Sequence, residues 1–180
     1  MLRYFIWLIA VLGLIIILIV LLLPGSKKGP AGNLLTYRYA NTDAVTRLKI
    51  DGPINADAIH KSIEINVDRS SVTYDEFSGY NGHIVKQQTY PSNENAYNNF
   101  LWALYRAGFS LPVTSTASEL GYCPLGQRYI FSITNGSSTV QRMWSTSCGI
   151  GIYKGSVSLT LQLFENQVPD YSSLTSGTNL

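Results

Sequence analysis

Cysteine and histidine are scarce in this chain of 180 residues, which has two of each. A structural zinc site takes four cysteine or histidine ligands in closely paired spacings. Here Cys123 and Cys148 lie far apart in the sequence, and His60 and His83 stand well upstream of both. We therefore expect no metal site. We also expect no cofactor, because the P-loop, dinucleotide, EF-hand, G-x-S-x-G and H-E-x-x-H motifs are all missing from the sequence.

Charged residues are also few, at 13% of the chain, and they form neither a basic stripe nor an acidic block. The 13 Lys and Arg residues nearly balance the 11 Asp and Glu residues. A surface that binds nucleic acid needs clustered positive charge. The sequence therefore predicts no nucleic-acid partner.

What the chain has instead is a long apolar run near its start. Residues 4–23 carry no charge, and twenty residues of helix measure about 30 Å, the thickness of a hydrocarbon core. Pro24 and Gly25 end the run. The sequence predicts a transmembrane anchor over residues 1–23, with residues 4–23 in contact with the lipid bilayer.

A cleaved signal peptide is the alternative interpretation of this run. It would have an apolar core of about 7–15 residues with a small-x-small cleavage site close behind. The nearest such match, residues 29–31, lies well past the core, so we expect an uncleaved anchor. Arg3 on one flank nearly cancels Lys27 and Lys28 on the other, so charge alone does not set the orientation.

The rest of the chain is long enough for one folded domain. Residues 24–33, PGSKKGPAGN, have the composition of a short linker. Residues 34–170 are expected to form a single α+β domain. Residues 171–180 are rich in Ser and Thr and are expected to form a flexible tail.

Alternation of apolar and polar residues predicts an antiparallel sheet in the first half of this domain. Residues 45–50 and 60–69 alternate with the period of a half-buried strand. Segments 71–77 and 83–90 flank Asn81-Gly82, a pair typical of a two-residue type I′ hairpin loop. We expect an antiparallel meander over residues 46–90.

The hydrophobic period then changes to that of a helix. Residues 93–107 are expected to form a helix across the sheet, with Ser92 or Asn93 as N-cap and Gly108 just beyond the C-terminal end. Residues 156–168 fit both a strand and a helix. Pro169 as a stop favours the helix.

The two cysteines flank a second predicted hairpin. Asn135-Gly136 is again a type I′ signal between two apolar segments. The register set by a two-residue loop places Cys123 directly opposite Cys148 at a non-hydrogen-bonded pair. Cα atoms there approach to about 4.5 Å, which a disulfide accepts. In this register both cysteines share an apolar face with Trp144, and Met143 points to the other face.

A disulfide at this place has two consequences. It would stabilise the domain by about 3.5 kcal/mol in the chain-entropy model. It would also require an oxidising compartment, which puts residues 24–180 outside the cytoplasm and the N-terminus inside. A catalytic Cys–His pair is the weaker alternative, because such partners meet only in the fold.

Tyrosine is abundant, with 12 residues. Its ring combines apolar area with a polar tip and suits recognition surfaces, although core packing explains any single tyrosine more simply. Five tyrosines fall on predicted strands or turns and are candidates for a binding surface: Tyr37, Tyr39, Tyr74, Tyr80 and Tyr90.

Three stretches, CPLGQRYIF (residues 123–131), WSTSCG (144–149) and LFENQVPDY (163–171), carry a family resemblance. With them the chain resembles small, single-pass, membrane-anchored exported proteins of ultrasmall host-dependent bacteria of the Saccharibacteria type. The resemblance covers residues 95–171 and the anchor. It implies an exported, anchored domain and no particular activity, so no functional residue is transferred from it.

Together these observations predict a single-pass membrane protein with one extracytoplasmic α+β domain, in which one or two helices cover an antiparallel sheet with a disulfide-clamped hairpin. The expected function is non-catalytic, as a binding or accessory module of the cell envelope with a protein or glycan partner. The alternative is an envelope hydrolase whose site is assembled from scattered residues such as His60, His83 and a carboxylate.

Overall fold

The computed structural model describes residue 39, residues 41–109 and 117–178, and residue 180. The chain divides into two units, Met1–Asn33 and Leu34–Leu180, and every described residue lies in the second. No helix among the described residues is long and apolar enough to cross a membrane. The predicted anchor and linker, together with Tyr37, lie outside the described residues.

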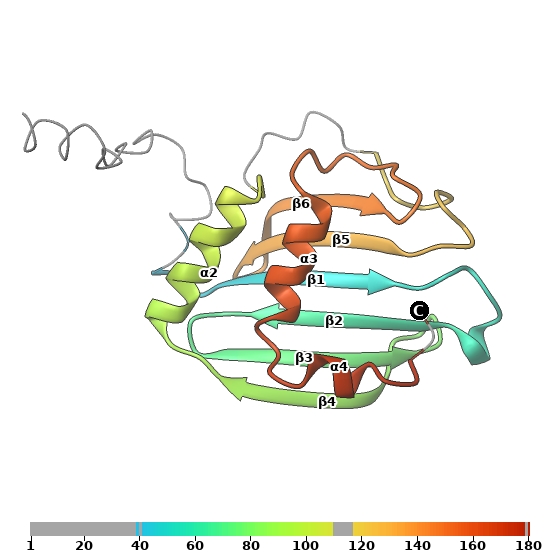
Figure 1. Cartoon of the computed structure of the whole chain (residues 1–180), viewed down its shortest axis with the longest axis horizontal. Coiled ribbons are helices and arrows are strands. Elements are labelled where there is room, and N and C mark those ends of the chain that lie inside the picture. Colours follow the sequence, from blue (N-terminus) through green and yellow to red (C-terminus); the bar gives the residue numbers. More distant parts are fainter. Residues whose placement is uncertain (1–38, 40, 110–116, 179) are drawn as a thin grey trace, which may run out of the picture. The chain divides into compact units, whose positions relative to one another are not determined.

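One sheet of six antiparallel strands forms the centre of the domain, in the order β4-β3-β2-β1-β5-β6 (Figure 1). The first four strands follow one another as a meander, as the sequence predicted. A β5–β6 hairpin adds to the free edge of β1. The strands are β1 (Ala44–Asp51), β2 (Lys61–Val67), β3 (Ser71–Ser78), β4 (His83–Pro91), β5 (Arg128–Asn135) and β6 (Ser138–Thr146).

The two longest helices begin and end where their capping residues stand. α2 (Glu94–Arg106) starts after Asn93, whose side chain accepts a hydrogen bond from the amide of Ala96 at 2.9 Å. Gly108 follows the helix with a positive φ of 91°. α3 (Val157–Glu165) is capped by Ser156. The helical interpretation of the C-terminal segment is therefore confirmed.

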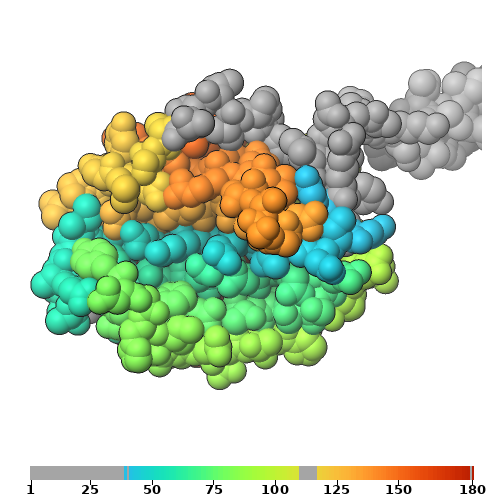
Figure 2. Space-filling view, turned by 180° about the vertical axis from the view of Figure 1, so that it is seen from behind, coloured from blue at the N-terminus to red at the C-terminus, as the bar shows by residue number. Residues whose placement is uncertain are grey.

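The helices α2, α3 and α4 (Tyr171–Leu174) cover one face of the sheet (Figure 1). Phe100 of α2 meets Phe164 of α3 edge to face, with ring centroids 5.1 Å apart. Under them lie buried apolar residues of alternate strand positions, such as Leu48, Ile65 and Phe131. Each such side chain stabilises the fold by about 1.5–3 kcal/mol. The opposite face, seen in Figure 2, is formed by the strands themselves.

The described residues of the last segment, 171–178 and 180, differ from the flexible tail that the composition predicted. Leu174 is buried against the core. Lys86 Nζ donates to the carbonyl oxygen of Leu174 at 2.5 Å, and Thr178 Oγ1 donates to Glu76 Oε2 at 3.0 Å. The Ser/Thr-rich composition indicates a polar segment, but it gives no sign of these contacts with β3 and β4.

The two hairpin loops differ from the predicted type I′ pairs. Ser78 pairs with His83, so the β3–β4 loop has four residues, 79–82. Its first and last residues, Gly79 and Gly82, both have positive φ. In the β5–β6 hairpin Asn135 is not a loop residue but pairs with Ser138, so the loop is residues 136–137. Gly136 at the first position takes the positive φ of 57° that this geometry needs.

The register of the β5–β6 hairpin is consequently not the one predicted. A bulge beside Ile133 shifts the pairing, so that Phe131 lies opposite Met143 and Ile130 opposite Trp144. Met143 therefore belongs to the core and Trp144 to the other face, the reverse of the prediction. One extra residue in a strand is sufficient to exchange the two faces.

The predicted disulfide itself is confirmed: Cys123 and Cys148 are bonded, with their Cα atoms 5.9 Å apart. They do not face each other on paired strands, however. Both lie beyond the strand ends, Cys123 before Arg128 and Cys148 after Thr146. The bond therefore joins the two loops that enter and leave the hairpin. Cys123 has a positive φ of 49°, which places it in a turn and not in the ladder.

Candidate binding surface and cleft

Four loops meet at one end of the sheet, where β1, β3 and β6 end and β2, β4 and β5 begin. They comprise residues 52–59, 79–82, 117–127 and 147–151. Figure 2 shows the first three side by side along its left margin, coloured teal, green and yellow. This end of the domain is thus built from segments far apart in the sequence.

Contacts between different loops tie this end together. The disulfide joins the loops on either side of the hairpin. The amide of Ile54 donates to the carbonyl oxygen of Pro124 at 2.7 Å. The amide of Tyr80 donates to Asp57 Oδ1 at 2.7 Å, and its hydroxyl donates to the carbonyl oxygen of Asn55 at 2.9 Å. The loops therefore form a preorganised surface, which lowers the entropy cost of binding.

This end of the sheet also exposes most of the hydrophobic side chains that reach solvent. Of 11 exposed large hydrophobic residues in the described part of the chain, all except Trp102 and Leu159 lie here. Leu125 is 88% exposed, the highest value among them. Contiguous exposed apolar residues mark contact sites for proteins or membranes. We call this set the apolar tip: Ile54, Ile59, Tyr80, Ile84, Val85, Leu120, Tyr122, Leu125 and Ile150.

Charge is nearly missing from the loops of the apolar tip. The four loops contain no Lys or Arg, and their two acidic residues are Asp57 and Glu119. Both are engaged within the chain: Asp57 accepts from Tyr80, and Glu119 accepts from Arg142 Nη2 at 2.5 Å. Burial acts to raise the pKa of Glu119, but the hydrogen bond and charge of Arg142 outweigh it and lower that pKa. The tip therefore presents apolar area with a single exposed carboxylate in its four loops, that of Asp57, because the hydrogen bond from the Tyr80 amide leaves that charge in place.

His60 lies behind the tip in a buried polar network. Its Nε2 is 3.2 Å from Asp51 Oδ1, and Asp51 Oδ2 is 2.6 Å from Arg128 Nη2. The ring of Tyr80 stacks on the imidazole with centroids 4.0 Å apart. His60 is only 2% exposed. The network therefore supports the loops. His83 is not part of it, since it lies at the start of β4 with an exposed side chain.

The candidate tyrosines do not gather on one surface. Tyr74 is completely buried in the core beside Tyr171 and cannot contribute to a binding surface. Tyr39 and Tyr90 are half-buried against the core. Of the candidates that the structure describes, Tyr80 alone lies on the apolar tip, where it is 51% exposed. The predicted strand positions could not distinguish buried from exposed tyrosines, because a tyrosine on a strand can point to either face of the sheet.

The residues that define the tip were missed by reasoning from the sequence. Leu120 and Leu125 stand in a loop, where no hydrophobic period marks a buried face. A signal was nevertheless present. Leu125 lies between Pro124 and Gly126, so an apolar side chain is placed inside a turn, where a residue usually faces solvent.

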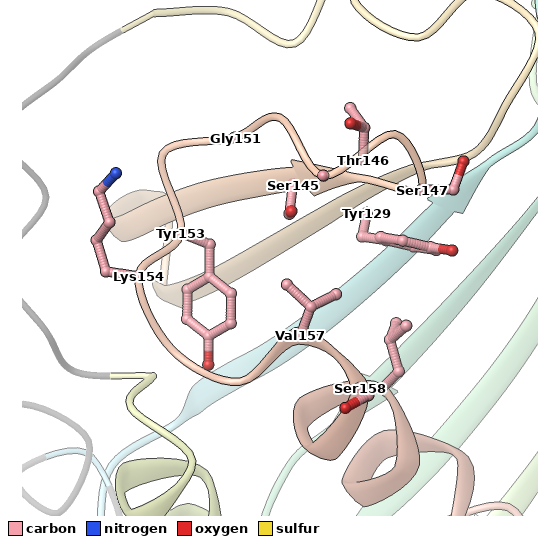
Figure 3. Close-up of a pocket in the computed structure, with 11 residues that line it drawn as sticks. Tyr129, Ser145, Thr146, Ser147, Gly151, Tyr153, Lys154, Val157 and Ser158 are labelled. Atoms are coloured by element: carbon pink, nitrogen blue, oxygen red, sulfur yellow. The ribbon is translucent and has the colours of Figure 1, made fainter.

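A cleft of about 600 Å³ opens between the end of β6 and the start of α3 (Figure 3). Its volume lies within the usual range for small-molecule sites. Gly151 forms part of its wall, where a Cβ atom would come within 2.5 Å of the carbonyl oxygen of Trp144. The glycine-rich segment at residues 149–155 thus shapes the cleft. The lining residues are Tyr129, Ser145, Thr146, Ser147, Gly149, Gly151, Tyr153, Lys154, Val157, Ser158 and Leu161.

The tyrosines of this cleft remain protonated in the neutral pH range. Burial raises the pKa of Tyr129, and the charge of Glu165 adds to this rise. Burial also raises the pKa of Tyr153, against a smaller opposite effect from its hydrogen bond with Thr160. The hydroxyl of Tyr129 donates to Gln127 at 2.7 Å. These rings give the cleft apolar walls that carry polar ends.

A smaller cleft of about 300 Å³ lies beyond the other end of α3, lined in part by Glu165 and Tyr171. Burial raises the pKa of Glu165, and a hydrogen bond with Tyr171 partly offsets this. Burial and the charge of Glu165 raise the pKa of Tyr171 well above its usual value. The carboxyl group of Glu165 and the hydroxyl of Tyr171 thus form a hydrogen bond with each other.

Comparison with models of known protein families and with curated proteins found no match to this chain.

Proposed function

We propose that this protein is a membrane-anchored, non-catalytic binding module of the cell envelope, and that the apolar tip is its docking surface for a protein partner. The observation that carries the proposal is a preorganised surface of nine exposed hydrophobic residues, beside which the carboxylate of Asp57 is the one exposed charge in the four loops. The centre of a protein interface is likewise apolar and depleted of charge. The anchor over residues 4–23 would keep the domain at the membrane.

The disulfide supports an extracytoplasmic location for this domain. Such bonds persist in oxidising compartments and are rare in the cytosol. The single-pass topology with the N-terminus inside follows from that location and from the predicted anchor. A partner for the tip would therefore be another envelope protein.

An envelope hydrolase is the second candidate, because His60 lies beside the carboxylate of Asp51. Both ring nitrogens of His60 are engaged, with Nδ1 3.1 Å from the carbonyl oxygen of Pro53 and Nε2 3.2 Å from Asp51 Oδ1. His60 would therefore act as a base only after Tyr80 moved off the ring and one of these contacts opened. We favour the binding module because Tyr80 is held by hydrogen bonds to Asp57 and Asn55. Hydrolysis of p-nitrophenyl acetate that rises in Tyr80→Ala and vanishes in His60→Ala would favour the hydrolase instead.

The docking surface can be tested by electrophoresis of native complexes from membranes dissolved in mild detergent. The wild-type chain is expected in a complex larger than its monomer, and Leu120→Asp with Leu125→Asp should return it to the monomer position. Leu159→Asp is the matched control, since Leu159 is exposed on α3 away from the tip. A wild-type chain that migrates as the monomer would contradict the proposal. A complex that contains only this chain would identify the partner as a second copy.

A further inference from the structure

The cleft between β6 and α3 presents hydrogen-bond donors that are not used within the described part of the chain. Val157 and Ser158 are the first two residues of α3. No acceptor among the described residues takes their amide hydrogens, whereas Ser156 accepts those of Leu159 and Thr160. Free amides at the start of a helix, together with its dipole, favour an anion.

Ser145 gives a second, independent indication of a ligand. The residue is 6% exposed, and its hydroxyl, which takes part in none of the hydrogen bonds found among the described residues, keeps some contact with the open space of the cleft. Figure 3 shows this hydroxyl pointing into the space between Tyr129, Tyr153 and Val157. A hydroxyl in such a place is costly unless a ligand or water completes its hydrogen bonds.

The one charged residue that lines the cleft is positive, as the binding of an anion requires. Lys154 lies on its rim with an exposed side chain, which in Figure 3 points away from Ser145 and Val157 and has to turn inward to reach an anion there. None of the 11 described lining residues is acidic. The acidic residue of α3 is Glu165, at the far end of that helix, where it lines the smaller cleft and acts on this one only through the pKa of Tyr129.

We propose that this cleft binds an acidic sugar, with its carboxylate or phosphate group held by the amides of Val157 and Ser158, the hydroxyl of Ser145 and the ammonium of Lys154. The volume of about 600 Å³ leaves room for more than the anion. The faces of Tyr129 and Val157 offer apolar walls for a sugar ring. This site is separate from the apolar tip and does not depend on the partner proposed for it.

The test uses the purified full-length chain in detergent micelles, with ¹⁵N-labelled amides observed by NMR at constant ionic strength. The probes are glucuronate for the carboxylate, glucose 6-phosphate for the phosphate, and glucose as the uncharged control. Saturable shifts of the Val157 and Ser158 amides are expected with one or both acidic probes and not with glucose. The stronger of the two responses identifies the anion.

Substitutions test whether binding depends on the residues of this cleft or only on general charge attraction. Lys154→Gln and Ser145→Ala should each weaken binding about tenfold, because each removes a hydrogen bond to a charged group. Lys49→Gln is the matched control, since Lys49 is a similarly exposed lysine on β1. It should leave the affinity unchanged. The proposal is overturned if neither acidic probe shifts these amides, if glucose shifts them equally, or if Lys154→Gln binds as the wild type does.

Discussion

The two ends of the six-stranded sheet are closed by loops of different chemistry. At the end opposite the apolar tip, the β2–β3 turn at residues 68–71 and the β5–β6 loop at residues 136–137 are short and polar. Asp68 holds the first of these turns by accepting from the amides of Ser70 and Ser71 at 2.6 and 2.8 Å. We call these two turns the polar turn end.

The loops of the apolar tip are longer, and contacts between separate segments hold them. The polar turn end satisfies its own backbone locally and needs no other loop. The tip requires a disulfide, a buried ionic network and bonds between loops to keep its hydrophobic residues in place. The polar turn end thus serves the fold, and under the proposed function the additional bracing of the tip keeps its hydrophobic residues in place for a partner.

The largest effect is expected from removal of the disulfide. Cys123→Ala with Cys148→Ala opens a loop closed over a sequence separation of 25 residues and should cost about 3.5 kcal/mol of unfolding free energy. For a domain of this size the loss lowers the melting temperature by about 10 °C. Circular dichroism during heating measures it. A change of less than about 1 kcal/mol would contradict a bracing role for the bond.

A slightly smaller effect is expected from Asp51→Ala. The substitution leaves the buried guanidinium of Arg128 without its counter-charge, which should cost about 3 kcal/mol. Urea unfolding of both proteins measures the difference. The matched control is Asp43→Ala, which breaks the exposed pair with Arg69 at the other end of the sheet and should cost less than about 1 kcal/mol. Equal costs would show that the network behind the tip has no special role.

At the polar turn end, Asp68→Ala should cost about 1 kcal/mol near neutral pH, because partly exposed hydrogen bonds are lost. Burial acts to raise the pKa of Asp68, but hydrogen bonds from Ser70 and Ser71 outweigh it and lower that pKa. The carboxylate therefore contributes its stability above the unfolded pKa of about 3.9. That contribution is lost as pH falls through the lower, folded value.

Urea unfolding of the wild type and Asp68→Ala at neutral pH and in acid measures this dependence. The difference in unfolding free energy between the two proteins should shrink in acid. A difference that grows in acid would contradict the pKa direction.

The smallest effect on stability is expected at the tip surface itself. Leu125→Ser should change the unfolding free energy by less than about 0.5 kcal/mol, because Leu125 is 88% exposed and buries little area in the monomer. Urea unfolding of the chain in determined amounts of detergent measures it. A loss of more than about 1 kcal/mol would mean that Leu125 serves the fold and not a partner.

The sequence predicted the parts of this domain whose signals are local. Alternation placed Ile63, Ile65 and Val67 on the buried face of β2, and capping residues placed α2. The bulge beside Ile133 has no clear signal in the local sequence, so the predicted register of the hairpin and the predicted face of Trp144 were wrong. A single unpaired residue in the ladder decides that face.

The candidate sites were harder to predict because each is formed by residues from distant parts of the sequence. The cleft joins Tyr129, Ser145 and Val157 from two strands and a helix. The apolar tip consists of exposed residues such as Leu125, whose position in a loop gives no periodic pattern. Only the disulfide, which joins two of these loops, was visible in the sequence.

The central claim is a disulfide-braced tip outside the cytoplasm, and the state of its two thiols in membranes tests it most directly. The intact mass of the full-length chain is measured after thiol alkylation under denaturing conditions, with and without prior reduction. The account predicts a monomeric mass with no alkyl group before reduction and with two after it. Alkylation of both Cys123 and Cys148 without reduction would contradict the brace and the location together.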